Sequence, residues 1–181
     1  VRMFQEGELK VKITAAFTDL DRLKGENWSA SDRPDYPAWD DCPPSGDKGV
    51  EFRQRAELRL VSGGEVFSDR RGNGSGEFHG WVSHRDGAAP DAISLLMFAD
   101  ASPPPVLTVF GPVGWVPTVE LTVQVRAHPS PGPIQFHTAC RHLTNGVVDA
   151  DGEYWDSNGK LVAVSRQTAK FRLDSARISK A

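Results

Sequence analysis

A short apolar segment, residues 92–101, is followed by three consecutive prolines at 103–105 and lies between segments in which apolar and polar residues alternate. We predict a helix for this segment, with Asp91 as its N-cap, because proline lacks a backbone N–H and cannot continue a helix. A single apolar helix among many strands is buried most simply against one antiparallel sheet. The sequence therefore predicts an α+β fold in which a curved antiparallel sheet wraps around one central helix.

Alternation with a period of two residues predicts the strands of this sheet. Every second residue from Val119 to Val125 is apolar, which is typical of a half-buried strand. Asn145-Gly146 is a strong hairpin signal, and a second turn is predicted at residues 156–159. The predicted strands are residues 51–61, 77–85, 118–126, 134–143, 147–155 and 160–173.

The first 49 residues have a different character. Residues 1–5 and 8–18 are predicted to form a hairpin, which we expect to join a larger sheet because an isolated hairpin is only marginally stable. Residues 19–49 contain four prolines and show no periodicity, so we interpret them as a connector. Three aromatic side chains of the connector are expected to hold it against a surface: Trp28, Tyr36 and Trp39.

A short internal similarity bears on the domain organisation. Residues 7–11 resemble residues 159–163, each after a hairpin turn, although similarities of this length also arise by chance. We expect residues 1–18 to be the last hairpin of a mostly absent N-terminal unit. The other expected parts are the connector at 19–49, a C-terminal domain at 50–173 and a tail at 174–181.

Charge and composition exclude several classes of function. The net charge is −3 with acidic and basic residues interspersed, so no basic stripe is present that could follow a nucleic-acid backbone. No run of about 18 apolar residues predicts a membrane span. Cys42 falls in the connector and Cys140 in a predicted strand, which makes a structural disulfide improbable and fits a reducing compartment. We expect a cytoplasmic protein that binds neither nucleic acid nor membrane.

Asp100 is the most informative single residue, because it is the only charged residue from Ala92 to Val119. On a helix it aligns with Ile93, Leu96 and Met97. A carboxylate on such an apolar face needs hydrogen bonds or a raised pKa, and it is suited to act as a general base. The alternative is that Asp100 lies in the last helical turn and points to solvent.

Two further polar residues are candidates for a site. Thr118 opens its strand on the same face as Glu120, Thr122 and Gln124, and an ordinary strand threonine would give the same pattern. Gln167 shares a face with small and apolar residues, so its amide needs partners. Those partners could belong either to the backbone or to a functional site.

Other arrangements of reactive residues fail on geometry. His137 points away from Cys140 and His142 in a strand, so these three cannot bind one ion, and we predict no metal site. The glycines at 72, 74 and 76 do not lie between a strand and a helix, as a dinucleotide-binding motif requires. No Gly-x-Ser-x-Gly motif is present. We therefore predict no cofactor.

Three segments of the sequence are informative together: APDA at 89–92 with LLMFADASPP at 95–104, GWVPTVELTV at 114–123, and YWDSNGKLVAVSRQ at 154–167. They resemble one known family, the thioesterase-like superfamily related to type II bacterial acyl-CoA thioesterases. The similarity extends over about residues 50–171, and the three segments together are far more specific than any one alone.

The resemblance implies a double hot-dog protein, in which two hot-dog units of one chain pack together as a pseudo-dimer. It implies an acyl-CoA substrate, a role in lipid metabolism, and catalysis by Asp100, Thr118 and Gln167. These residues would hold a water molecule that attacks the thioester, with the aspartate as base. Only the last hairpin of a first unit is expected here, so we expect a homo-oligomer or pairing with a second hot-dog unit. Ala15 occupies the position that corresponds to Gln167 in that hairpin.

Two alternatives remain beside the thioesterase. A hot-dog module could bind acyl groups or partner proteins without turnover. A hydratase of the same fold would need a histidine paired with an acid near the helix, and no histidine occurs between His84 and His128.

Overall fold

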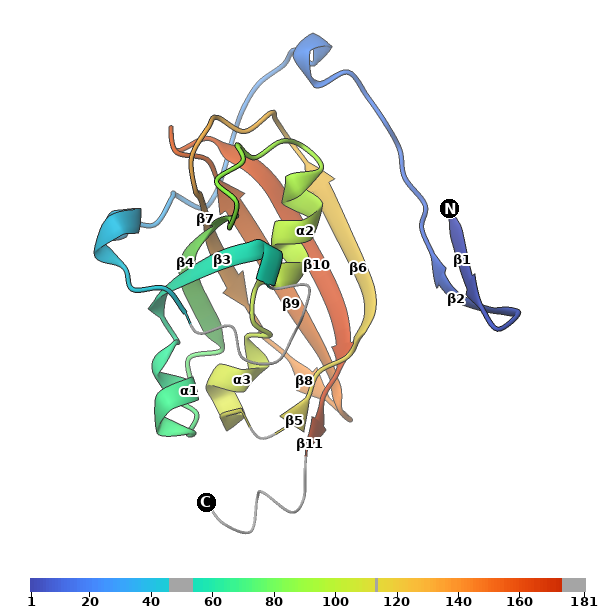
Figure 1. Ribbon diagram of the computed structural model, residues 1–181, viewed down its shortest axis with the longest axis vertical. Coiled ribbons are helices and arrows are strands. Elements are labelled where there is room, and N and C mark those ends of the chain that lie inside the picture. Colours follow the sequence, from blue (N-terminus) through green and yellow to red (C-terminus); the bar gives the residue numbers. More distant parts are fainter. Residues whose placement is uncertain (46–53, 113, 174–181) are drawn as a thin grey trace.

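A seven-stranded antiparallel sheet curves around one main helix in the computed structural model, which describes residues 1–45, 54–112 and 114–173 (Figure 1). The strand order is β3-β4-β7-β9-β10-β6, and the short β8 pairs with β9. The main helix is α2 (Ser94–Ala101). The strands are β3 (Ala56–Ser62), β4 (Glu77–His84), β6 (Thr118–Val125), β7 (Ile134–Ala139), β8 (Leu143–Thr144), β9 (Val147–Trp155) and β10 (Leu161–Lys170). The predicted α+β architecture is therefore confirmed.

The core lies between α2 and the concave face of the sheet. Leu95 and Phe98 of α2 are fully buried, as are Phe136 of β7 and Tyr154 of β9. Burial of one such aliphatic or aromatic side chain contributes about 1.5–3 kcal/mol, so these contacts hold the helix on the sheet. The face of α2 opposite to the core is left exposed.

The prediction of Asp91 as the N-cap was wrong, because α2 begins two residues later than the predicted segment and Ile93 is its N-cap, but Asp91 still binds the first residue of the helix. Asp91 Oδ1 accepts hydrogen bonds from the backbone N–H of Ser94 at 2.7 Å and from its hydroxyl at 2.7 Å. These bonds satisfy donors that a helix start leaves without partners. The helix ends at Ala101, just before the three prolines.

Short elements that the sequence analysis did not predict complete the domain. Helices α1 (Glu65–Asp69) and α3 (Val106–Phe110) have five residues each, too few to show a helical period. Strand β5 (Gly114–Trp115) pairs with β11 (Arg172–Leu173), so the segment after α3 is fixed to the segment that follows β10. The predicted strand at 51–61 begins at Ala56, and its residues 51–53 lie outside the described residues.

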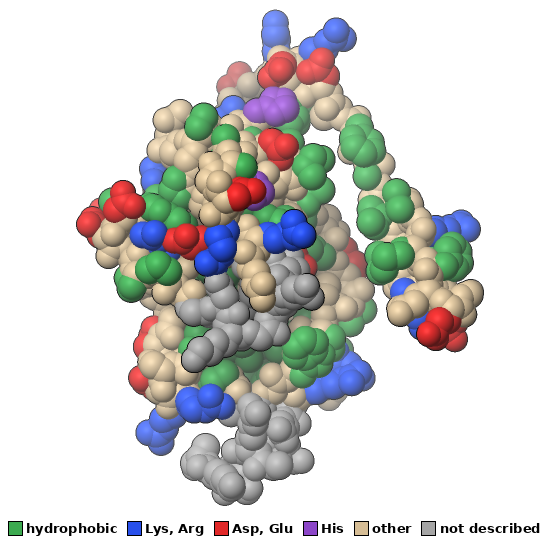
Figure 2. Space-filling model, viewed as in Figure 1, with side chains coloured by type: hydrophobic (Ala, Val, Ile, Leu, Met, Phe, Trp, Pro, Cys, Tyr) green, Lys and Arg blue, Asp and Glu red, His purple; other side chains and the backbone are tan. Residues whose placement is uncertain are grey.

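The N-terminal hairpin does not join the large sheet, and this expectation was wrong for the present chain. Strands β1 (Arg2–Gln5) and β2 (Glu8–Lys12) pair only with each other. The second arm ends at Lys12 rather than at Thr18, because β1 offers no partner beyond its four residues. Apolar side chains remain exposed along the hairpin, which Figure 2 shows separated from the body of the molecule.

The connector crosses the convex face of the sheet. Tyr36 contacts β4 and β7, and the carbonyl oxygen of Trp39 accepts a hydrogen bond from Arg59, whose guanidinium lies over the Trp39 ring. Gln135 on β7 donates to the Pro34 carbonyl oxygen and accepts from Arg33.

Two 3₁₀ turns interrupt the connector, η1 (Leu20–Arg22) and η2 (Trp39–Asp41). The expectation for Trp28 was wrong, since that side chain is 87% exposed.

No helix in the described ranges is long and apolar enough to cross a membrane. Both cysteines are free, in agreement with the expectation that they do not form a disulfide.

The turn between β9 and β10 is organised by a buried carboxylate, Asp156, which is 1% exposed. Its Oδ1 accepts from the backbone N–H of Asn158 and Lys160 at 3.0 and 2.9 Å, and its Oδ2 accepts from Ser130 N–H at 3.0 Å. Burial raises the pKa of Asp156, but these hydrogen bonds outweigh burial and lower the pKa below its usual value. The carboxylate thus joins the turn to the segment that precedes β7.

We expect Asp156→Asn to lower the free energy of unfolding by about 1–3 kcal/mol, because an amide nitrogen would then oppose one of the three N–H donors. A carboxyl whose pKa is lower in the folded state stabilises the fold above its unfolded pKa of about 3.9, and the stabilisation is lost as the pH falls below that value. Urea denaturation from pH 7 to pH 3 should therefore show that the free energy of unfolding falls less with decreasing pH in the variant than in the wild type. Asp151→Asn, which removes a largely exposed pair with Arg166, is the control and should cost less than about 1 kcal/mol.

Candidate active site

The three side chains singled out in the sequence meet at one place, although they come from three separate elements. Asp100 lies at the end of α2, Thr118 at the start of β6 and Gln167 in the second half of β10. Gln167 Nε2 donates to Thr118 Oγ1 at 2.7 Å and to Asp100 Oδ1 at 3.5 Å. The structure brings these side chains together, and their catalytic role stays a prediction.

A strand irregularity turns Thr118 toward Gln167. Along β10, Gln167 and Ala169 face the helix side of the sheet, and Gln167 is paired with Leu121 of β6. A regular ladder would then place Val119 opposite Ala169, but the register shifts after Thr168 and Ala169 pairs with Thr118 instead. Bulges re-aim side chains in this way and are frequent beside active sites.

This bulge corrects the face predicted for Thr118. The alternating pattern put Thr118 with Glu120, Thr122 and Gln124 on the polar outer face. The register shift moves Thr118 to the helix side, where its hydroxyl reaches the Gln167 amide.

The environment of Asp100 also differs from the predicted apolar face. Of the three residues aligned with it, Ile93 is 68% exposed and Leu96 is 42% exposed, and only Met97 packs against the core. Asp100 itself is exposed, and it is nonetheless held by the Gln167 amide. Each of the two alternatives for this residue is thus partly met: it lies in the last turn facing solvent, and it has a polar partner from a distant strand.

Hydrogen-bond polarity fixes how the three groups can act on a ligand. An ionised carboxylate only accepts hydrogen bonds, so the Gln167 nitrogen rather than its oxygen has to face Asp100. Both N–H groups of Gln167 then serve Asp100 and Thr118, which leaves the Gln167 carbonyl oxygen to accept from a third partner. Thr118 accepts from Gln167, so its own hydroxyl hydrogen is left to donate. One water molecule could satisfy all three groups.

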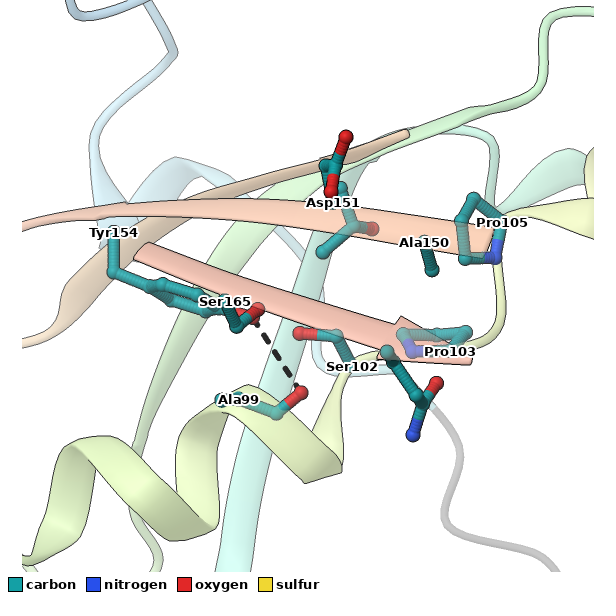
Figure 3. A pocket seen from close by; sticks show the side chains of 10 residues that line it. Ala99, Ser102, Pro103, Pro105, Ala150, Asp151, Tyr154 and Ser165 are labelled. Atoms are coloured by element: carbon teal, nitrogen blue, oxygen red, sulfur yellow. Dashed lines mark hydrogen bonds between the residues drawn. The ribbon is translucent and has the colours of Figure 1, made fainter. Parts of the chain in front are cut away.

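A small polar niche opens beside Gln167, between the end of α2 and strands β7, β9 and β10 (Figure 3). It has room for about one water molecule. The Tyr154 hydroxyl lies inside it, 3.4 Å from the Ala99 carbonyl oxygen and 3.3 Å from Ser165 Oγ. Burial raises the pKa of Tyr154, so the hydroxyl stays protonated. Thr138 Oγ1 lines the niche and is buried without a hydrogen-bond partner.

Glycine at position 152 is required for this niche. A Cβ atom there would lie 2.5 Å from Ser165 Oγ and 2.6 Å from the Tyr154 hydroxyl. The sequence analysis missed Ser165, although it lies two residues before Gln167 on the same face, and it also missed Tyr154 and Thr138. A polar residue at every second position of a strand next to a candidate site is the signal that could have found Ser165.

The histidines do not group as their spacing suggests. The described residues contain no cluster of His137 with Cys140 and His142, but β7 ends at Ala139, so Cys140 and His142 lie outside the strand that the geometric argument assumed. His137 instead joins Glu77 and His79 on the convex face of the sheet. Burial and the neighbouring His79 lower the pKa of His137, so this ring is neutral at pH 7.

Comparisons with known proteins agree with the fold. Residues 30–171 match the family model described as the acyl-CoA thioesterase C-terminal domain. A crystal structure of a proposed thioesterase II from Thermobifida fusca is 32% identical, with a TM-score of 0.70 over 82% of this chain and 57% of that chain. A protein of unknown function with a hot dog fold from Alicyclobacillus acidocaldarius is 22% identical, with a TM-score of 0.69 over 82% of this chain and 58% of that chain.

Among curated proteins, uncharacterized proteins of Mycobacterium bovis and Mycobacterium tuberculosis are 36% identical over 89 residues, which is 49% of this chain and 30% of each relative. The chain therefore spans less than two thirds of the length of these relatives and of the similar structures. The fold is the hot-dog fold, and the family model covers most of the chain. The chain belongs to the family of acyl-CoA thioesterase C-terminal domains.

Proposed function

We propose that this chain carries the catalytic residues of an acyl-CoA thioesterase, which hydrolyses an acyl-CoA thioester to the free acid and CoA. The proposal is supported chiefly by the meeting of Asp100, Thr118 and Gln167, joined by hydrogen bonds of 3.5 and 2.7 Å across three elements. Each residue alone has an ordinary structural explanation. A carboxylate, a hydroxyl and an amide at one open position form a set that can bind and activate a water molecule.

In this mechanism Asp100 accepts a proton from the bound water while the water oxygen attacks the thioester carbonyl carbon. The π electrons of the carbonyl move to its oxygen, giving a tetrahedral intermediate. When the carbonyl reforms, the carbon–sulfur bond breaks and the CoA sulfur takes the proton back from Asp100. Thr118 and Gln167 orient the water, and the Thr118 hydroxyl can donate to the developing negative charge.

The surroundings of the site suggest that it is completed by a second unit. Beside Asp100, the apolar side chains of Ile93, Leu96 and Val119 are 68%, 42% and 69% exposed. The niche beside Gln167 has room for about one water molecule, which is too little for an acyl chain. In our proposal a second hot-dog unit, from the same protein or from another copy, covers this face, and the acyl chain lies between the two units.

Thiol release tests the proposal directly. The protein would be given acyl-CoAs of increasing chain length, with release of CoA followed by a thiol reagent. We expect release of CoA and a preferred range of chain lengths. Saturable binding of acyl-CoA without thiol release at any length would instead support the acyl-binding module.

A further inference from the structure

The convex face of the sheet carries a second group of reactive side chains, on the face opposite to Gln167. Phe78 and Val82 of β4 are buried in the core, so the alternate residues Glu77 and His79 point to the convex face. In the antiparallel ladder His137 of β7 lies directly opposite His79. Two strands thus present two imidazoles and a carboxylate at one place.

The spacing of the three ligand atoms fits a transition-metal ion. Glu77 Oε2 is 3.1 Å from His79 Nε2 and 3.4 Å from His137 Nε2, and all three atoms lie within 4.8 Å of one another. Zinc binds nitrogen and oxygen at about 2.0–2.1 Å in tetrahedral sites, which places neighbouring ligand atoms about 3.3 Å apart. The two distances from Glu77 bracket this value.

His79 has a hydrogen-bonding partner on its other ring nitrogen, and His137 has a carboxylate near its own, beyond hydrogen-bonding distance. The Tyr36 hydroxyl lies 2.6 Å from His79 Nδ1, and Glu153 Oε2 lies 3.8 Å from His137 Nδ1. Histidines that bind metals almost always have such partners, which fix the ring orientation and the tautomer. Both Nε2 atoms lie near Glu77 Oε2, to which His79 Nε2 is hydrogen-bonded at 3.1 Å.

The group as it stands leaves one polar atom without a partner. His137 Nε2 is buried and forms no hydrogen bond, although Glu77 Oε2 lies 3.4 Å away. A buried polar atom without a partner is costly. Among the described residues, neither Glu77 nor Glu153 forms an ion pair with lysine or arginine, so two carboxylates flank the imidazoles. A cation would satisfy both features.

We propose that Glu77, His79 and His137 bind a divalent transition-metal ion of the zinc type, with water as the fourth ligand. The imidazole rings are stacked at 4.3 Å with an angle of 12° between their planes, so both have to tilt for their lone pairs to converge. The Cβ–Cγ torsion of histidine has a broad minimum, which makes this tilt inexpensive. The ion would join β4 to β7 and, through Tyr36, fix the connector on the sheet.

Zinc titration of the chelator-treated full chain tests the proposal without any assay of thioesterase activity. Calorimetry should show one zinc ion bound per chain, and zinc should raise the melting temperature. Magnesium and calcium should not bind, because imidazole favours zinc, copper and nickel over the harder ions. A wild-type chain that binds no zinc would overturn the proposal.

Variants distinguish this site from adventitious binding. Glu77→Gln keeps the shape of the side chain but removes its charge, and it should weaken zinc binding at least about 100-fold, as should His137→Ala. Tyr36→Phe should weaken it about 10–100-fold, the usual loss for a partner of a ligating histidine. His142→Ala, at an exposed histidine outside the group, is the control. Equal affinity in all four variants, each checked for folding by circular dichroism, would also overturn the proposal.

Discussion

Replacement of Asp100 by asparagine is expected to lower kcat for acyl-CoA hydrolysis about 10²–10⁴-fold, the usual contribution of a general base. Asparagine has the same shape as aspartate, but it cannot accept a proton from the water. Affinity for substrate should change little, because the carboxylate acts on the water rather than on the acyl-CoA. The measurement is steady-state thiol release by the protein, with the acyl-CoA concentration varied to separate kcat from KM.

The pH dependence gives this variant a second readout. In the wild type, kcat/KM should fall at low pH as the base becomes protonated, and Asp100→Asn should lose this acid limb. Glu120→Gln makes the same carboxylate-to-amide change at an exposed position of β6 outside the site, and it should leave kcat unchanged. If Asp100→Asn were as active as the wild type, the protein would still be a hydrolase, but the assignment of Asp100 as its general base would be wrong.

The unfolding free energy separates loss of chemistry from loss of structure. Asp100 is exposed, and surface substitutions usually change stability by less than about 0.5 kcal/mol. A denaturation curve for Asp100→Asn should therefore overlie that of the wild type.

The strand pattern could be predicted because alternation depends only on which face of a strand is buried. β9 has the predicted bounds, and β4 and β6 are each one residue shorter than predicted. Pattern alone could not show the bulge between β6 and β10, since a register shift depends on how two strands pair. The side chain that the bulge turns inward is Thr118, so the pattern placed a candidate residue on the wrong face while the resemblance selected it.

The polar cluster on the convex face also depends on strand pairing, which the sequence pattern does not reveal. Glu77 and His79 are two residues apart, which a strand places on one face, so half of the cluster was visible in the sequence. His137 is 58 positions further along, and only the pairing of β4 with β7 brings it opposite His79. The sequence spacing of His137, Cys140 and His142 resembles that of metal ligands, but in the described residues His137 groups with Glu77 and His79 instead.

The N-terminal hairpin shows where burial, rather than pattern, decides the outcome. Its alternating apolar residues have the period of a half-buried strand, and the strands do form and pair. Nothing in the described residues covers that apolar face, and Ile13 and Phe17 remain exposed. Local sequence specified the hairpin, but its packing depends on a surface that the described part of the chain does not supply.

Gln167 holds the other two site residues, so we expect its replacement to have the second-largest effect on catalysis. Gln167→Ala removes both donors, and kcat should fall about 10²–10³-fold, as when one positioned donor is lost from an active site. Gln167→Glu nearly preserves the shape but places a second carboxylate beside Asp100, where the amide donated at 3.5 Å. Because like charges at this distance repel and the donor is lost, the glutamate variant should be no more active than the alanine variant.

Combining these changes tests whether the residues act on one water molecule. If they do, the double variant Asp100→Asn with Gln167→Ala should lose much less activity than the product of the two single losses. Once Asp100 is replaced, the water is no longer activated, so losing the glutamine that orients this water costs little more. The same should hold for Asp100→Asn with Thr118→Ala, where Thr118→Ala alone is expected to cost less than the aspartate change. Losses that simply multiply would mean that Gln167 and Asp100 contribute independently, for instance with the glutamine contacting the substrate. In that case the hydrogen bonds that Gln167 donates to Asp100 and Thr118 would be structural, and the water would have to be held by other groups.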